Sequence, residues 1–253
     1  LFSCVGALAL LAATPTLAQN PSGQSAQAGG SAIESIVVTA RRTEELLRDI
    51  PATVHAVTAA DLEATGPVAG TGDLLRTVPG VRFNDLSAPN LAEVAIRGSG
   101  SQRATGADSG VGLFVNGAYV GSSTLGGRNF KNIDFFDVAR VEVNAGPQGA
   151  LYGRNSEFGV VNLVLAKPQF DTSGYISDTF TAKLNQNNIT GVVNLGINDD
   201  FAVRVGAQSI GQTKGFYTNP VDHSYYDHSD GWLARAQFRY KHGNVDLNLL
   251  IDA

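Results

Sequence analysis

The sequence lacks methionine altogether and has a single cysteine and a single tryptophan among its 253 residues. With Cys4 as its one thiol, the chain cannot form an internal disulfide. The missing initiator leads us to expect that the sequence starts inside a longer precursor. No apolar run beyond the first residues approaches the length of a transmembrane helix, so any membrane crossing would have to be made by β-strands.

Charged residues are also scarce, at 16% of the chain, and the formal net charge is −5. Without a dense stripe of lysine and arginine, the composition argues against a nucleic-acid partner. The phosphate-binding pattern G-x-x-x-x-G-K-[ST] does not occur, and Gly98-Ser99-Gly100 lacks the third glycine of a dinucleotide-binding turn. We therefore predict neither an enzyme nor a bound cofactor.

The 29 glycines and many short alternating segments are typical of a β protein rich in turns. Beyond Phe170 the alternation becomes regular, which predicts strands with one apolar and one polar face. The apolar positions of three such strands are Phe201, Val203, Val205 and Ala207; Trp232, Ala234, Ala236, Phe238 and Tyr240; and Val245, Leu247, Leu249 and Ile251. A soluble sandwich would alternate in the same way. Two tight connections and one long one, residues 215–230, instead favour the short turns and longer external loops of a transmembrane β-barrel.

Residues 141–168, V-E-V-N-A-G-P-Q-G-A-L-Y-G-R-N-S-E-F-G-V-V-N-L-V-L-A-K-P, are the most informative stretch. Val141 and Val143 alternate with polar neighbours as in a half-buried strand, a turn follows, and residues 160–165 resume as a strand. The turn motif comprises Gly146, Pro147, Gln148, Gly149, Tyr152 and Gly153. The stretch resembles the end of the plug domain of TonB-dependent outer-membrane receptors, where G-P-Q-G-x-L-Y-G-R-N and an apolar strand ending in K-P are characteristic. Gly-rich turns occur in any β-rich domain, but this general explanation does not account for the specific order of residues in the motif.

The preceding sequence continues this resemblance, because D-L-L-R-T-V-P-G-V, A-I-R-G and F-V-N-G-A-Y-V follow one another as in a plug domain. The residues themselves predict strands at 52–57, 81–84, 93–97 and 112–115, a hairpin turn at Asn116-Gly117, and helices that begin near Thr58 and Thr71. The resemblance implies an α+β plug domain over residues 43–168. Residues 169–253 would be roughly the first five strands of an antiparallel transmembrane β-barrel that has roughly 22 strands in this class. We therefore expect the chain to be a fragment of a longer receptor.

The N-terminal residues predict export. Residues 5–13 are apolar, and Thr16-Leu17-Ala18 resembles a cleavage site, so residues 1–18 are expected to be a signal peptide that is truncated at its start. Residues 19–31 are rich in Gln, Ser, Gly and Ala, as in a flexible linker.

A short β-prone run closes this linker region, residues 19–42. It consists of Ile36, Val37, Val38, Thr39 and Ala40. The run resembles a TonB box, the segment that the periplasmic protein TonB captures by adding it as an edge strand. Capture needs an extended and accessible segment, and we expect one here; the alternative is a buried first strand of the plug.

Two arginines of the plug have roles that the resemblance implies. In the family, arginines at the I-R-G and Y-G-R positions, here Arg97 and Arg154, meet glutamates of the barrel and help to hold the plug. The partner carboxylates would lie beyond Ala253, and the alternative for each is a solvated surface arginine. The chain departs from the family pattern at Asn144-Ala145, where a basic residue commonly precedes the glycine, and at Glu157-Phe158, where small residues are usual. These departures put the local contacts with the barrel wall in question.

Together these features predict an outer-membrane receptor of a Gram-negative cell that imports a scarce solute, with a ferric siderophore as the first choice. The expected partners are TonB with the ExbB/ExbD motor, outer-membrane lipid and an extracellular ferric chelate. A non-iron substrate such as vitamin B12 or a saccharide is an alternative, and so is a passive porin or a secreted adhesive β protein. No metal site is predicted: residues 222–230 concentrate His and Asp without a recognised zinc spacing, and we interpret them as a polar external loop.

Overall fold

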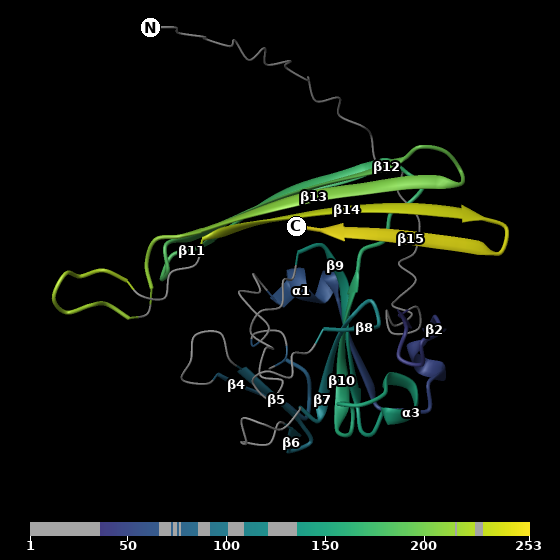
Figure 1. The fold of residues 1–253 in the computed structure, drawn as a ribbon, viewed down its shortest axis with the longest axis horizontal. Helices are drawn as coiled ribbons and strands as arrows, with labels where there is room; N and C mark the ends of the chain where they lie inside the picture. The colour runs from purple at the N-terminus through teal and green to yellow at the C-terminus, as the bar shows by residue number, and fades with distance from the viewer. Residues whose placement is uncertain are drawn as a thin grey trace, which may run out of the picture. The chain divides into compact units, whose positions relative to one another are not determined.

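The computed structural model describes residues 36–65, 72, 75, 77–85, 92–100, 109–120, 136–215, 217–225 and 230–253. All of these residues belong to one compact unit of the chain (Figure 1). The predicted signal peptide, the linker up to residue 35 and most of the helix expected near Thr71 lie outside the described residues.

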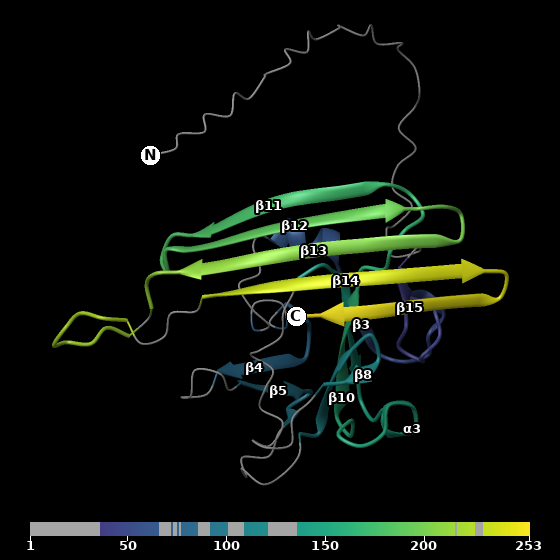
Figure 2. The same ribbon diagram turned by 45° about the horizontal axis from the view of Figure 1, so that its top comes forward.

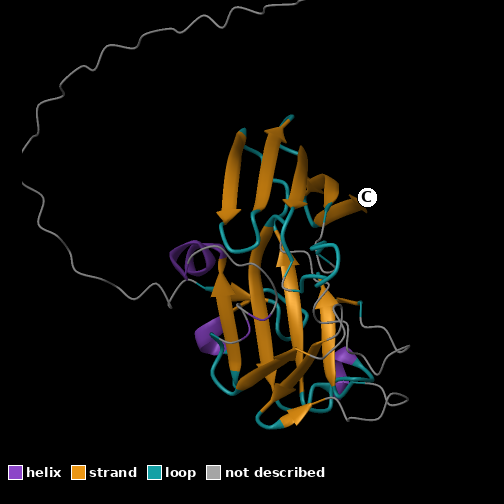
Figure 3. Cartoon of the chain, turned by 90° about the vertical axis from the view of Figure 1, so that its left-hand side faces the viewer, coloured by secondary structure: helices purple, strands orange, loops and turns teal. Residues whose placement is uncertain are grey.

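The predicted plug contains a five-stranded mixed sheet and a smaller three-stranded sheet (Figure 3). The larger sheet has the order β3-β9-β10-β7-β8, in which β10 pairs parallel with β7 and the other pairings are antiparallel. Its strands are β3 (Val54–Thr58), β7 (Val111–Val115), β8 (Ala118–Tyr119), β9 (Val138–Ala145) and β10 (Gly159–Leu165). The smaller sheet contains β4 (Val81–Asp85), β5 (Ala92–Ile96) and β6 (Ser99–Gly100). The two strands that flank the turn motif, β9 and β10, therefore lie inside the larger sheet.

Short elements of this region form close to where the sequence predicts them. The helix α1 (Ala59–Thr65) starts with a capping box: the Thr58 amide donates to Asp61 Oδ2 over 2.9 Å, and the Asp61 amide donates to Thr58 Oγ1 over 3.2 Å. Asn116 and Gly117 have φ values of 49° and 78°, as a type I′ turn between β7 and β8 requires. The four expected strands are β3, β4, β5 and β7, with ends shifted by at most two residues. No helix in the described ranges is both long and apolar enough to cross a membrane.

Alternation along β9 gives the larger sheet two different faces. Val141 and Val143 are buried in the main hydrophobic core, whereas Glu142 and Asn144 lie on the opposite face. The other members of the core come from both sheets and from the chain just before β4, and they are Leu75, Val78, Val81, Phe83, Ala92, Val94, Ile96, Val111, Leu113, Val138, Val161, Leu163 and Leu165. The face opposite this core carries the candidate site.

The second part of the chain is an antiparallel meander of five long strands (Figure 2). They are β11 (Ser173–Thr181), β12 (Gln186–Gly196), β13 (Phe201–Gln212), β14 (Gly231–His242) and β15 (Val245–Asp252). Each strand pairs with the next one along the chain, so β11 and β15 each have one neighbour among the described residues. The strands expected after residue 169 are thus present, and their sheet is open at both edges.

The meander exposes its apolar face and buries its polar face. On β14, the Trp232 side is exposed, with 68% of that residue accessible, whereas Arg235 and Gln237 on the other side are buried. The exposed apolar residues of the sheet include Ile176, Phe180, Ile189, Val193, Leu195, Val205, Tyr240, Val245, Leu247, Leu249 and Ile251. A soluble sandwich buries its apolar faces against each other. The exposed apolar face therefore favours a barrel wall and disfavours the soluble sandwich, which the sequence alone did not exclude.

Arginines on the polar face of the meander bind the predicted plug. Arg204 of β13 makes two hydrogen bonds to the Asp137 carboxylate, from Nε to Oδ2 at 2.6 Å and from Nη2 to Oδ1 at 2.5 Å. These side chains are only 12% and 5% exposed, respectively. Arg235 of β14 donates from Nη1 to the Phe136 carbonyl over 2.6 Å. Gly206 leaves room for this approach, because a Cβ there would lie 2.6 Å from the Phe136 ring.

A second group of contacts joins β14 to the chain that leaves β10. Gln237 Nε2 donates to the Ala166 carbonyl over 2.7 Å, and Arg239 Nη1 donates to the Pro168 carbonyl over 3.1 Å. Arg239 also binds both oxygens of Asp246 on β15, at 2.9 and 2.7 Å. The meander therefore holds the plug largely through hydrogen bonds from charged or amide side chains.

We predict that Asp137→Asn loosens the attachment of the plug. The change leaves the largely buried Arg204 without its counter-ion, and breaking a buried pair in this way costs about 3–5 kcal/mol. For the receptor expressed from the complete gene, the expected result is a lower thermal unfolding temperature in detergent and faster proteolysis of the plug. Asp199→Asn, in the exposed turn after β12, is the control. Identical unfolding of the two variants would contradict the proposed importance of the pair.

We also predict that a polypeptide of these 253 residues forms no closed barrel by itself. The free edges of β11 and β15 leave backbone groups unpaired, and each such group costs several kcal/mol in lipid. The purified polypeptide should give no heat-modifiable band on detergent gels and transport no solute into liposomes, while protease should trim it toward the plug. A heat-modifiable species protected from protease throughout residues 175–251 would overturn this expectation.

Candidate functional site

Residues 36–40, the box segment, lie at the start of the described chain. Within them β1 (Val37–Val38) pairs antiparallel with β2 (Glu45–Leu46) in a separate two-stranded sheet. Val37 is 40% exposed, but Val38 is 0% exposed and Ala40 is also buried. The expectation of a freely accessible segment is therefore wrong, and the alternative of a buried strand describes this structure.

Packing explains why the segment is buried. Val38 and Ala40 form a small core with Ile50, which follows the 3-10 helix η2 (Leu47–Asp49), and this core contacts Val54 and Ala56 of β3. The contact lies on the face of the larger sheet opposite the main core, because Ala56 pairs with Glu142 of β9. Apolar β-prone residues suit capture by a partner strand and packing on the plug equally well.

Thr39 makes most of the polar contacts of the box segment. Its amide donates to Glu142 Oε1 over 2.8 Å, and its hydroxyl lies 3.0 Å from each Glu142 carboxylate oxygen. Its carbonyl accepts the Arg42 amide at 2.8 Å and the Tyr152 hydroxyl at 3.3 Å. The amide, the hydroxyl and the carbonyl of this one residue are thus all hydrogen-bonded.

A strip of polar side chains lies beneath the segment. The polar strip consists of Arg140, Glu142 and Asn144 on β9 and Asn162 on β10. Glu142 is 0% exposed, and Arg140 Nε donates to its Oε1 over 2.8 Å. Asn162 accepts the Gly117 amide at 3.0 Å and donates from Nδ2 to Thr39 Oγ1 over 3.4 Å, whereas Asn144 lies beside the Tyr152 hydroxyl. The box segment therefore covers buried polar groups as well as apolar ones.

The turn motif places an aromatic side chain beside Thr39. Gly146 and Gly153 have φ values of 104° and 81°, which favour glycine, and between them α3 (Gly149–Tyr152) makes a single turn. Pro147 and Gly149 are exposed, and the Gln148 amide donates to the Ser156 carbonyl over 2.9 Å. Tyr152 is buried against Phe114, with ring centroids 4.9 Å apart.

The Tyr152 environment keeps its hydroxyl available as a donor. Burial raises the pKa of Tyr152, and the negative charge of Glu142 raises it further. The Arg42 guanidinium lies 4.8 Å from the centre of the ring and donates to the Leu151 carbonyl over 2.8 Å. The protonated phenol therefore donates to Thr39 throughout the physiological pH range.

Arg97 and Arg154 lie apart from these contacts, and both are exposed. Arg97 has a φ of 53° and donates from Nη2 to Thr53 Oγ1 over 2.8 Å. Arg154 makes no hydrogen bond or ion pair with any described residue. Within the described ranges neither arginine reaches a carboxylate of the meander, so their role in holding the plug stays a prediction.

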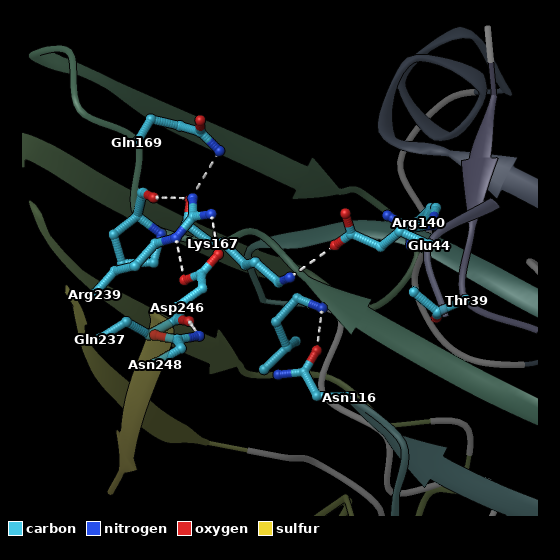
Figure 4. A network of polar contacts seen from close by, with 12 residues as sticks. Thr39, Glu44, Asn116, Arg140, Lys167, Gln169, Gln237, Arg239, Asp246 and Asn248 are labelled. Carbon is cyan, nitrogen blue, oxygen red and sulfur yellow. Dashed lines mark hydrogen bonds and ion pairs between the residues drawn. The ribbon is translucent and has the colours of Figure 1, made fainter. Parts of the chain in front are cut away.

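An ion pair ties the chain after the box segment to the end of β10 (Figure 4). Lys167 Nζ lies 2.9 Å from Glu44 Oε1. This hydrogen bond, with the charge of Lys167, holds the pKa of Glu44 below its usual range. Both side chains are well exposed, so the pair contributes no more than about 1 kcal/mol. Figure 4 shows Arg239 and Asp246 of the meander near the same lysine.

The His/Asp-rich loop shows ordinary turn contacts where it is described. Asp222 Oδ1 accepts the amide and the hydroxyl of Ser224 at 3.0 and 2.7 Å, and Asp230 Oδ1 accepts the Gln212 amide at 2.8 Å. Residues 226–229 lie outside the described residues. Among the residues that are described, no group of three or more His, Cys, Asp or Glu side chains could hold a metal ion.

Sequence reasoning missed Glu142 and the Asp137–Arg204 pair. The alternation around Glu142 predicts a polar position opposite the core but does not say which group it binds. Asp137 and Arg204 are 67 residues apart, and no local pattern links them. The signal that was available is the set of arginines on the polar face of the predicted strands, which need acceptors once that face is buried.

Comparison with known proteins finds a matching domain and several similar receptors. Residues 46–160 match the family model of the TonB-dependent Receptor Plug Domain. The Vitamin B12 transporter BtuB of Photobacterium profundum is 30% identical over 136 residues, which cover 54% of this chain and 21% of that protein. The Iron-regulated outer membrane virulence protein of Vibrio cholerae is 25% identical over 206 residues, which cover 78% of this chain and 30% of that protein.

Solved structures share the fold. The pyoverdine outer membrane receptor FpvA of Pseudomonas aeruginosa matches 85% of this chain and 29% of its own, with a TM-score of 0.64 and 17% identity. The ferric yersiniabactin uptake receptor FyuA of Yersinia pestis matches 75% of this chain and 29% of its own, with a TM-score of 0.62 and 22% identity. The chain therefore spans less than a third of the length of these relatives. Residues 46–160 are therefore a TonB-dependent receptor plug domain, and the chain shares the fold of solved receptors of this kind over most of its length.

Proposed function

We propose that the chain is part of an outer-membrane receptor that imports a scarce solute, with residues 36–40 as the segment that TonB captures. The observation that carries this proposal is the pairing of β1, which has β2 as its one strand neighbour in the described part of the chain. A strand with a free edge can accept a partner strand through main-chain hydrogen bonds. The chain that follows β1 matches the family model of the TonB-dependent receptor plug over residues 46–160.

The contacts in the plug suggest which part would detach first if β1 were pulled. The β1–β2 pairing consists of two residue pairs, and the small core under it has three buried members. The larger sheet is held by longer pairings, by the main core and by Asp137–Arg204. Segments with few buried contacts open at lower free energy than the rest of a fold. We propose that TonB, driven by the ExbB/ExbD motor, detaches the β1–β2 region first.

The exposed apolar face of β11–β15 is proposed to contact outer-membrane lipid. Large apolar patches are unfavourable in water, and an apolar outside with a polar inside is the pattern of membrane barrels. Export to that membrane would use the predicted signal peptide at residues 1–18. No chemical transformation is part of the proposal.

We propose a ferric siderophore as the solute. The supporting relative is the iron-regulated protein of Vibrio cholerae, whose similarity extends over 78% of this chain. Vitamin B12 is the second candidate, because the Photobacterium protein named for that transport is more similar, at 30% identity, although over a shorter stretch.

We predict that Val38→Pro, expressed from the complete gene, abolishes energised uptake and preserves binding of the solute at the cell surface. Proline removes the amide donor of β1 and resists strand pairing. Val38→Ala is the control, because it trims the buried side chain but keeps the backbone donor, and it should retain uptake. Uptake and binding assays on whole cells separate the two steps. Normal uptake by the Val38→Pro variant would contradict the assignment of residues 36–40 as the TonB box.

We further predict that a strain lacking the gene loses growth on at least one ferric siderophore as sole iron source and regains it with the complete gene. Uptake of radiolabelled iron on that chelate should depend on the energised inner membrane and fail with Val38→Pro. Labelled cyanocobalamin is supplied in parallel. Uptake of the vitamin, with no effect on any ferric chelate, would reject the siderophore and favour the second candidate.

A further inference from the structure

We propose that Glu142 is a positioning residue that sets how often the box segment leaves the plug, and that it acts by holding Thr39. The inference rests on the proposed function for what the released segment then binds. The holding contact itself stands on geometry: both carboxylate oxygens lie 3.0 Å from the Thr39 hydroxyl, and one lies 2.8 Å from its amide.

The carboxylate is suited to hold the segment without fixing it permanently. Glu142 is fully buried while the segment is docked, so hydrogen bonds to its charge are strong. When the segment leaves, water can replace Thr39, and Arg140 on the same strand still donates over 2.8 Å. The Glu142 carboxylate is therefore hydrogen-bonded to protein when the segment is docked, and to Arg140 and water when it is released. The segment can thus leave without stranding a buried charge.

The test measures release through the reactivity of a cysteine at position 38. Outer membranes are prepared from cells that express the complete gene with Cys4→Ser and Val38→Cys, and the rate of maleimide labelling is followed. Val38 is 0% exposed, so its cysteine reacts only when the segment has left. Val37→Cys, at a 40% exposed position, marks full reactivity. Leu113→Cys, in the main core, reports any unfolding of the plug.

Glu142→Ala should speed labelling at position 38 by roughly tenfold, since it removes hydrogen bonds to a buried charge. Glu142→Gln and Thr39→Val each remove part of the contact and should give smaller increases. Glu157→Gln, at an exposed carboxylate of the plug, is the matched control and should change nothing.

Equal labelling rates in the Glu142 variants and Glu157→Gln would overturn the proposal, and so would an increase that Leu113→Cys shares. If alanine unfolds the plug, the glutamine and valine variants still decide the question. Capture of the purified TonB C-terminal domain by the same membranes is measured separately. Faster labelling supports the role of Glu142 whatever the capture result, whereas absence of capture in every variant counts against the proposed function alone.

Discussion

The reversed polarity of β11–β15 is the constraint on which the other contacts depend. Its buried face carries the charged side chains of Arg204 and Arg235, and buried charges are unfavourable unless hydrogen-bonded acceptors meet them. The plug supplies the Asp137 carboxylate to Arg204 and the Phe136 carbonyl to Arg235, while the counter-ion of Arg235 is Asp252 on the neighbouring strand β15. These hydrogen bonds fix the direction and geometry of the attachment between the plug and the meander, and Leu250 of β15 adds an apolar contact with the main core of the plug.

The larger sheet of the plug combines two kinds of packing. On one face Val141 and Val143 join a closed hydrophobic core, which water does not replace. On the other face Glu142 meets the short box segment through hydrogen bonds that water can substitute. On strand β9, one face therefore packs permanently in the hydrophobic core. The other face makes hydrogen bonds that can be exchanged for hydrogen bonds with water. The difference between the faces follows from the period-two alternation of its side chains.

Local sequence patterns predicted the local structure well. The Thr58–Asp61 capping box and the Asn116-Gly117 turn depend on residues that are neighbours in the chain, and both form as expected. Alternation predicted which side chains share a face, including the apolar outside of the meander. These features could be read from the sequence because each is fixed by a few adjacent residues.

The candidate site was predicted less completely, because its contacts join distant parts of the chain. The β-prone run of the box segment does not distinguish capture by a partner from burial of Val38 on the plug. Thr39 and Glu142 are 103 residues apart, so nothing near either residue indicates the other. Arg97 and Arg154 were singled out from a family pattern that does not itself supply their partners.

The order of strands in the larger sheet delays its assembly during growth of the chain. β3 pairs with β9 alone, and β7 reaches the sheet through β10, so both wait until residues 138–165 have been made. Pairings between distant segments form slowly and leave strand edges open to aggregation in the meantime. An emerging or exported chain therefore has to be kept unaggregated until β9 and β10 close on each other. The glycine-rich turn between these strands thus sits in the hairpin on which the pairing of both earlier strands depends.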